Sequence, residues 1–147
     1  MKKIEEGLVD SGLLGIPYKL GGKDRSGIDC IGVTVLWLKS QGIDFEYDDR
    51  QGPVLANWWE RNPRRFMDAI LEIGTIVRFN ELRKFDCLML IGNEQAVFPS
   101  CLGVMVDDRH MLTATEERGT FVEMLNLYWK SRFWGAVRLR KVVEMGL

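Results

Sequence analysis

Histidine is almost missing from this sequence, in which His110 is the single one. Cysteine is scarce too, with three residues in 147 and no Cys-x-x-Cys pair, so we expect free thiols rather than a disulfide framework. No apolar run approaches the length of a membrane span, and residues 1–6 lack the apolar stretch of a signal peptide. These absences predict a protein with no membrane span and no signal peptide.

Neither sign of charge dominates, because 20 basic and 21 acidic residues give a net charge of −1. Such a balance gives no electrostatic reason to expect a nucleic acid or an anionic membrane as a partner. Since 46% of the residues are hydrophobic, a chain of this length can bury most of them in one core. We therefore expect a single domain over residues 1–147.

The order of the predicted elements indicates an α+β fold. The predicted helices are a short one before the break at 15–17 and others over 30–40, 54–60, 63–73 and 125–131. The predicted strands span 75–79, 86–91, 95–98, 101–106, 110–115, 119–123 and 133–143. Helices that come mostly before the strands predict N-terminal helices packed on an antiparallel sheet.

One cysteine stands at a predicted helix start. Asp29 and Cys30 come where a glycine-rich turn runs into the apolar segment 30–40. The free N–H groups and the partial positive charge at a helix start favour the thiolate over the thiol, which makes Cys30 a candidate nucleophile. The alternative is a cysteine that simply packs in the core, which is also our interpretation of Cys87 in its apolar strand.

Three short motifs precede and include this cysteine: Pro17-Tyr18, Gly21-Gly22 and Asp29-Cys30-Ile31-Gly32. In this order they resemble the Pro-Tyr turn, the glycine pair and the Asp-Cys-Ser-Gly helix start of the NlpC/P60 family of papain-like cysteine peptidases. Segments 83–90 and 102–106 resemble two strands of that family, so the likeness runs from residue 15 to about residue 140. The resemblance implies a papain-like fold with Cys30 as the nucleophile. It also implies that Tyr18 and Asp29 line the substrate-binding cleft, although Tyr18 could instead simply cover a helix.

The departures from the family pattern concern the other catalytic positions. The resemblance places the catalytic histidine at Cys101 and the third, orienting polar residue at Thr113. It therefore implies a domain that keeps its nucleophile and has lost its base. Cys30 and Cys101 should face each other across the cleft. A metal ion is the alternative interpretation of two facing thiols, but with Thr113 they fall short of the four ligands that zinc takes, so we expect no metal and no other cofactor.

The only histidine follows the expected base by nine positions, just past the turn at 107–109. Side chains alternate along a strand and a turn reverses the chain, so we expect His110 near a hairpin tip rather than beside Cys30. The alternative is that His110 serves as the general base. Without a proton donor for the leaving amine, amide hydrolysis loses on the order of 10²- to 10⁴-fold.

Within the family, three further segments resemble small tail-assembly or tail-tip proteins of long-tailed bacteriophages: 41–43, 47–49 and 134–138. This likeness implies other tail or baseplate proteins as partners and peptidoglycan as a further candidate ligand. It also implies a location in the cytoplasm of the bacterial host during assembly and in the virion tail afterwards. Of the adjacent tryptophans Trp58 and Trp59, at least one is a candidate partner contact.

Three functions compete at this point. The first is a structural component of a phage tail tip, built on an impaired peptidase domain. The second is an active peptidoglycan endopeptidase or amidase in which Cys30 attacks a peptide carbonyl. The third is an acyltransferase or thiol-dependent hydrolase of small substrates on the same fold.

Overall fold

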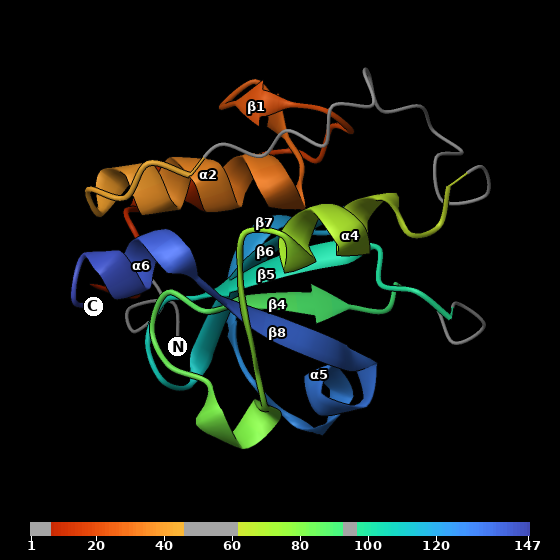
Figure 1. Ribbon diagram of the computed structural model, residues 1–147. Helices are drawn as coiled ribbons and strands as arrows, with labels where there is room; N and C mark the ends of the chain where they lie inside the picture. The colour runs from red at the N-terminus through yellow and green to blue at the C-terminus, as the bar shows by residue number, and fades with distance from the viewer. Residues whose placement is uncertain (1–6, 46–61, 93–96) are drawn as a thin grey trace.

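The computed structural model describes residues 7–45, 62–92 and 97–147, and a six-stranded antiparallel sheet forms its centre (Figure 1). The order of the strands is β3-β8-β4-β5-β6-β7. Their bounds are Gly74–Val77 for β3, Cys87–Leu90 for β4, Cys101–Met105 for β5, His110–Thr115 for β6, Gly119–Met124 for β7 and Phe133–Leu139 for β8. The predicted antiparallel sheet is confirmed.

Helices cover one face of this sheet. Helix α2 (Cys30–Ser40) packs on β5 and β6, α4 (Arg65–Leu71) contacts β3, and α6 (Arg140–Glu144) contacts β3 and β8. Figure 1 shows these three helices above the sheet and α5 (Leu127–Arg132) below it. The smaller elements are the 3-10 helices η1 (Ser11–Leu13) and η2 (Phe79–Glu81) and the two-residue strands β1 (Lys23–Asp24) and β2 (Gly27–Ile28). The predicted α+β class is therefore confirmed.

The sheet separates two hydrophobic cores, and strand β4 contributes to both. All four β4 residues are buried, and because side chains alternate across a strand, they divide between the two faces. Cys87 and Met89 belong to the larger core under the helices, whereas Leu88 and Leu90 belong to the smaller core with Trp129 of α5. The predicted packing role of Cys87 is consistent with its complete burial.

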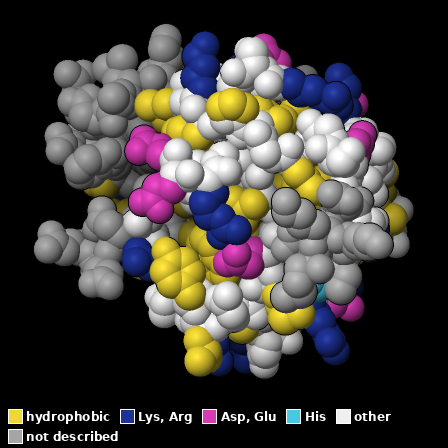
Figure 2. Space-filling model, turned by 180° about the vertical axis from the view of Figure 1, so that it is seen from behind, with side chains coloured by type: hydrophobic (Ala, Val, Ile, Leu, Met, Phe, Trp, Pro, Cys, Tyr) yellow, Lys and Arg dark blue, Asp and Glu magenta, His cyan; other side chains and the backbone are white. Residues whose placement is uncertain are grey.

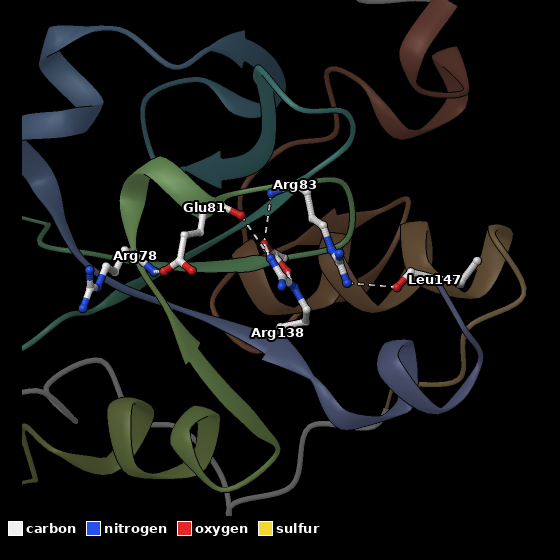
Figure 3. A network of polar contacts seen from close by, with 6 residues as sticks. Arg78, Glu81, Arg83, Arg138 and Leu147 are labelled. Atoms are coloured by element: carbon white, nitrogen blue, oxygen red, sulfur yellow. Dashed lines mark hydrogen bonds and ion pairs between the residues drawn. The ribbon is translucent and has the colours of Figure 1, made fainter.

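A buried ion pair ties the beginning of β4 to the end of β8 (Figure 3). Arg138 donates from Nε and Nη2 to the two carboxylate oxygens of Asp86, each at 2.9 Å. The Asp86 side chain is completely buried and also accepts the Arg83 backbone N–H at 3.0 Å. Arg138 reaches the Glu81 carbonyl as well, at 3.0 Å. Every oxygen of the buried carboxylate therefore has a donor, which a buried charge requires.

The residue before Asp86 has an unusual backbone. Phe85 has φ +78°, a left-handed conformation that L-residues other than glycine rarely adopt. Its ring is buried and lies 5.5 Å from the Trp37 ring of α2, centroid to centroid, and its N–H donates to the Met105 carbonyl at 2.8 Å. Core packing and this hydrogen bond hold Phe85 in a position that glycine would occupy without strain.

The structure differs from the predicted elements at several places. The strand predicted over 133–143 ends at Leu139, and a helical turn follows that buries Val142 and leaves Val143 exposed. Of the strand predicted over 95–98, the described residues Val97 and Phe98 form a bend. The strand predicted over 75–79 ends at residue 77, before η2. The helix predicted over 54–60, the segment 47–49 and the two adjacent tryptophans lie outside the described residues.

Candidate functional site

The site is built around the first turn of α2, which begins at Cys30 as the sequence predicts. Asp29 is the N-cap residue, and its Oδ1 accepts the Gly32 N–H at 2.8 Å. Its other oxygen, Oδ2, accepts the Gly21 N–H at 2.8 Å. One buried carboxylate therefore caps the helix and fastens the preceding glycine turn to it.

Two glycines of the motif are required by close backbone approach. A Cβ at Gly32 would lie 2.5 Å from the Gly22 carbonyl oxygen, and a Cβ at Gly22 would lie 2.3 Å from the Gly27 carbonyl oxygen. No L-residue with a side chain fits such distances without a shift of the backbone. The glycine turn and the helix start thus pack directly on each other, and this packing fixes the position of Cys30.

Cys30 points toward the start of β5. The Leu102 N–H donates to Cys30 Sγ with an N···S distance of 3.3 Å, and Thr34 Oγ1 donates to the Cys30 carbonyl at 2.8 Å. The residue is 7% exposed. The hydrogen-bond partner of the sulfur is a backbone group, which no side-chain pattern in the sequence could reveal.

The pKa of Cys30 is raised well above that of a free cysteine. The main cause is the neighbouring Cys101 thiol, followed by burial and by the negative charges of Cys101 and Asp29, and the Leu102 N–H opposes them. The expectation that the helix start favours a Cys30 thiolate is therefore wrong for the folded chain. Burial and adjacent negative charge outweigh the helix dipole here.

Cys101 and Thr113 lie beside this thiol. Cys101 Sγ and Thr113 Oγ1 are 3.5 Å apart, and Thr113 Oγ1 also donates to the Leu102 carbonyl at 2.7 Å. The neighbouring Cys30 thiol lowers the pKa of Cys101, as does the contact with Thr113, against the effect of burial. Of the two thiols, Cys101 is therefore the one that ionises first.

Tyr18 belongs to the same neighbourhood. It forms a parallel bridge with Ile28, immediately before the helix cap, and is half-buried. Burial raises the pKa of Tyr18, and the negative charges of Cys30, Asp29 and Cys101 raise it further. The phenol therefore stays protonated and can donate a hydrogen bond near the two thiols.

His110 lies elsewhere, at the turn between β5 and β6. Its backbone N–H donates to Asp107 Oδ1 at 2.7 Å, and its ring Nδ1 lies 3.0 Å from Asp107 Oδ2. In the sheet it pairs with Met124 of β7. The expectation that His110 sits at the hairpin tip is confirmed, and its ring bonds a carboxylate of that turn.

The structure thus brings together Cys30, Cys101 and Thr113, with Asp29 and Tyr18 around them, and it separates His110 from them. Chemically, the arrangement offers two adjacent thiols and a hydroxyl. Within residues 7–45, 62–92 and 97–147, no three His, Cys, Asp or Glu side chains are grouped as a metal ion requires. None of the helices in these ranges is long and apolar enough to cross a membrane.

Comparison with known proteins points to one family. The model of the NlpC/P60 family matches residues 15–138. An NlpC/P60 family protein from Bacillus cereus ATCC 10987 has a similar structure, with a TM-score of 0.60 and 26% sequence identity over 90% of this chain and 39% of its own. No curated protein matches the chain significantly in sequence.

Two more solved structures share the fold. A protein from Staphylococcus aureus subsp. aureus Mu50, described as similar to a lipoprotein of the NLP/P60 family, gives a TM-score of 0.60 at 16% identity over 95% of this chain and 42% of its own. The NlpC/p60 domain of the peptidoglycan hydrolase SagA gives 0.56 at 19% identity over 86% of this chain and 90% of that domain. The chain spans about two fifths of the first two proteins.

Proposed function

The chain belongs to the NlpC/P60 family, and from this premise we propose that it is a structural or assembly component of a bacteriophage tail tip, with an impaired peptidase site. Its partners are then other tail or baseplate proteins, with peptidoglycan as a further ligand. Its location is the host cytoplasm during assembly and the virion tail afterwards.

The observation that carries this proposal is the contact between Cys30 and Cys101. The resemblance places the catalytic base at position 101, and there Cys101 lies beside the nucleophile position, whose sulfur accepts the N–H of the next residue, Leu102, at 3.3 Å. The only imidazole, that of His110, bonds Asp107 instead. Amide hydrolysis needs a group that takes the proton of the nucleophile and returns it to the leaving amine. Because the pKa of Cys101 is lowered and that of Cys30 is raised, Cys101 is a weak base for the Cys30 proton.

An assembly role also needs exposed surface for partners. Several large apolar side chains of the described residues are exposed, among them Leu127 (84%), Ile76 (66%) and Tyr128 (54%). Figure 2 shows yellow apolar patches on one face, interrupted by charged side chains. The segment 134–138, which carries part of the phage-tail likeness, lies within β8 and supplies Arg138 of the buried ion pair, so it also serves the fold.

An active peptidoglycan hydrolase is the second candidate, favoured by the intact start of α2. Asp29, the glycine turn and Cys30 keep the arrangement in which a thiol at a helix start attacks a carbonyl and nearby backbone N–H groups bind the oxyanion. One structural neighbour, SagA, is named a peptidoglycan hydrolase. In this case the base comes from a partner chain or from Cys101.

Digestion of purified peptidoglycan and its stem peptides separates the two candidates. The experiment compares the wild type with Cys30→Ala and Cys101→His, and mass spectrometry identifies the fragments. We expect an inert wild type and a gain of cleavage in Cys101→His. Cleavage by the wild type that disappears in Cys30→Ala would refute the impaired site.

The assembly role has its own test. In a phage that encodes this chain, deletion of the gene should give defective tails by electron microscopy. Complementation with Cys30→Ala should restore normal tails, because the proposed role uses the surface of the domain and not the thiol. Normal tails without the gene would refute the structural role.

A further inference from the structure

The two thiols at the start of α2 and β5 form a pair whose chemistry differs from that of a peptidase. The Leu102 N–H that donates to Cys30 Sγ at 3.3 Å is joined by a peptide bond to Cys101. The Cys30 sulfur is therefore held beside the backbone of Cys101, and the neighbouring Cys101 thiol raises the pKa of Cys30. Both cysteines are free thiols in this structure.

The surroundings of the pair are asymmetric. Cys101 is half-buried and its sulfur lies 3.5 Å from the Thr113 hydroxyl, which itself donates to the Leu102 carbonyl. Cys30 is 7% exposed and sits behind it, at the helix start. A small oxidant from solvent therefore meets Cys101 before Cys30.

We propose that Cys30 and Cys101 are a redox-active thiol pair, which a peroxide converts to a disulfide between the start of α2 and the start of β5. Cys101 is the sulfur that reacts with the peroxide, and Cys30 is the sulfur that resolves the product. This inference does not rest on the tail-tip role, because it uses only the contact between the two thiols.

The oxidation proceeds in two balanced steps. The Cys101 thiolate attacks one oxygen of hydrogen peroxide, the O–O bond breaks, and the products are the Cys101 sulfenic acid and hydroxide, which becomes water by taking up a proton. Cys30 sulfur then attacks the sulfenic sulfur, the S–O bond breaks, and the departing hydroxide takes the Cys30 proton to form water. Two thiols are oxidised by two electrons in total, and one peroxide is reduced to two waters. A dithiol reductant reverses the disulfide by exchange.

Cys87 provides an internal control within the same chain. It is completely buried in β4, and burial raises its pKa to about 12. Cys87 belongs to the larger core, whereas the side chains in contact at the site are those of Cys30, Cys101 and Thr113. Oxidation through the native fold should therefore link Cys30 to Cys101 and leave Cys87 free.

Peptide mapping without reduction tests this directly. The native wild type is treated with hydrogen peroxide, remaining thiols are blocked, and the chain is cut with trypsin and a glutamate-specific protease. Cleavage after residue 94 separates Cys87 from Cys101, which otherwise share a tryptic peptide. The expected product is peptide 26–39 linked to peptide 95–109, with peptide 85–94 unlinked. Links that involve Cys87 as often as the other two, or the absence of any intramolecular link, would overturn the proposal.

The order of the two steps is tested with variants that keep one sulfur. In Cys30→Ser, a cyclic 1,3-dione should trap a sulfenic acid at Cys101, because the resolving thiol is gone. In Cys101→Ser, trapping at Cys30 should be at least tenfold slower. Cys87→Ser serves as the matched control and should form the disulfide at the wild-type rate. Equal trapping rates at the two cysteines would refute the assigned order, and thermal melting of the reduced variants identifies any that fail to fold.

Discussion

The ion pair between Asp86 and Arg138 gives the most direct test of how this fold is held together (Figure 3). Replacement of Arg138 by methionine keeps most of the apolar stem but removes two hydrogen bonds of 2.9 Å from a carboxylate with no solvent exposure. Removing one partner of a buried pair costs about 3–5 kcal/mol, since the other charge is left uncompensated. Arg138 itself is 19% exposed and the Arg83 N–H remains on Asp86, so water and this donor offset part of the loss. We therefore expect a loss of about 3 kcal/mol in the free energy of unfolding.

The exposed pair between Arg64 and Asp68 is the matched control. Its N···O distance is 3.2 Å, but the two side chains are 57% and 53% exposed. Exposed i,i+4 pairs contribute about 0.3–0.5 kcal/mol, so Arg64→Met should change the unfolding free energy by no more than about 0.5 kcal/mol. Urea denaturation at neutral pH measures both variants, and equal m-values make the two midpoints comparable.

One result would refute this reasoning: an Arg138→Met variant as stable as Arg64→Met to within about 1 kcal/mol. A double variant tests the cause of this loss of stability, which we assign to the unpaired charge of the buried Asp86 carboxylate rather than to the attraction between the two side chains. Asp86→Leu combined with Arg138→Met should recover part of the stability that Arg138→Met alone loses. A double variant less stable than the single one would indicate that the loss arises from packing.

Three further outcomes follow from the structure. Asp29→Ala should lower the unfolding free energy by about 1–2 kcal/mol in thermal melts, because two backbone donors lose their acceptor. Asp29→Asn should lose about half as much, since its single amide oxygen can accept from only one of the two donors. Phe85→Gly should be more stable than Phe85→Ala by about 1 kcal/mol in urea denaturation, because only glycine relieves the strain of the positive φ. At most positions the alanine variant is the more stable of the two, and the same order here would contradict the strain at Phe85. Iodoacetamide at pH 7 should alkylate Cys101 before Cys30 and leave Cys87 unmodified, since the pKa of Cys101 is lowered and the pKa of Cys87 is raised to about 12. Mass spectrometry of the alkylated peptides at successive times gives the order of reaction. Alkylation of Cys87 as fast as that of Cys101 would contradict this prediction.

The parts of the fold that the sequence predicts are those with local causes. The buried helix over 30–40 coincides with α2, because a capping aspartate and an uninterrupted apolar segment mark its start and its length. The strand over 133–143 fails at its end, where Val142 reaches the core from a helical turn rather than from an extended chain. Hydrophobicity alone does not distinguish these two ways of burying one valine.

The electrostatics of the site could not be predicted in the same way. A helix start lowers the pKa of a thiol through nearby backbone N–H groups, and the sequence predicts where the helix starts. At Cys30 the opposing effects come from β5, which supplies Cys101, and from burial by the sheet, and these depend on tertiary packing. Asp29 has two opposite effects on the site: its carboxylate stabilises the helix start that carries Cys30, and its negative charge raises the pKa of the Cys30 thiol.

The family resemblance implies a histidine at position 101, where this chain has a cysteine. Around this position Asp29 caps α2, the Leu102 N–H reaches Cys30, and Thr113 bonds the Leu102 carbonyl. An imidazole at position 101 would have separate nitrogens to accept and to donate a proton, whereas a thiol has a single sulfur that does one or the other. That sulfur is suited to electron exchange with a second thiol beside it. We therefore expect an imidazole at position 101 to favour hydrolysis on this scaffold and a thiol to favour redox chemistry. The peptidoglycan digestion and the peptide mapping of Cys30 and Cys101 distinguish the two cases.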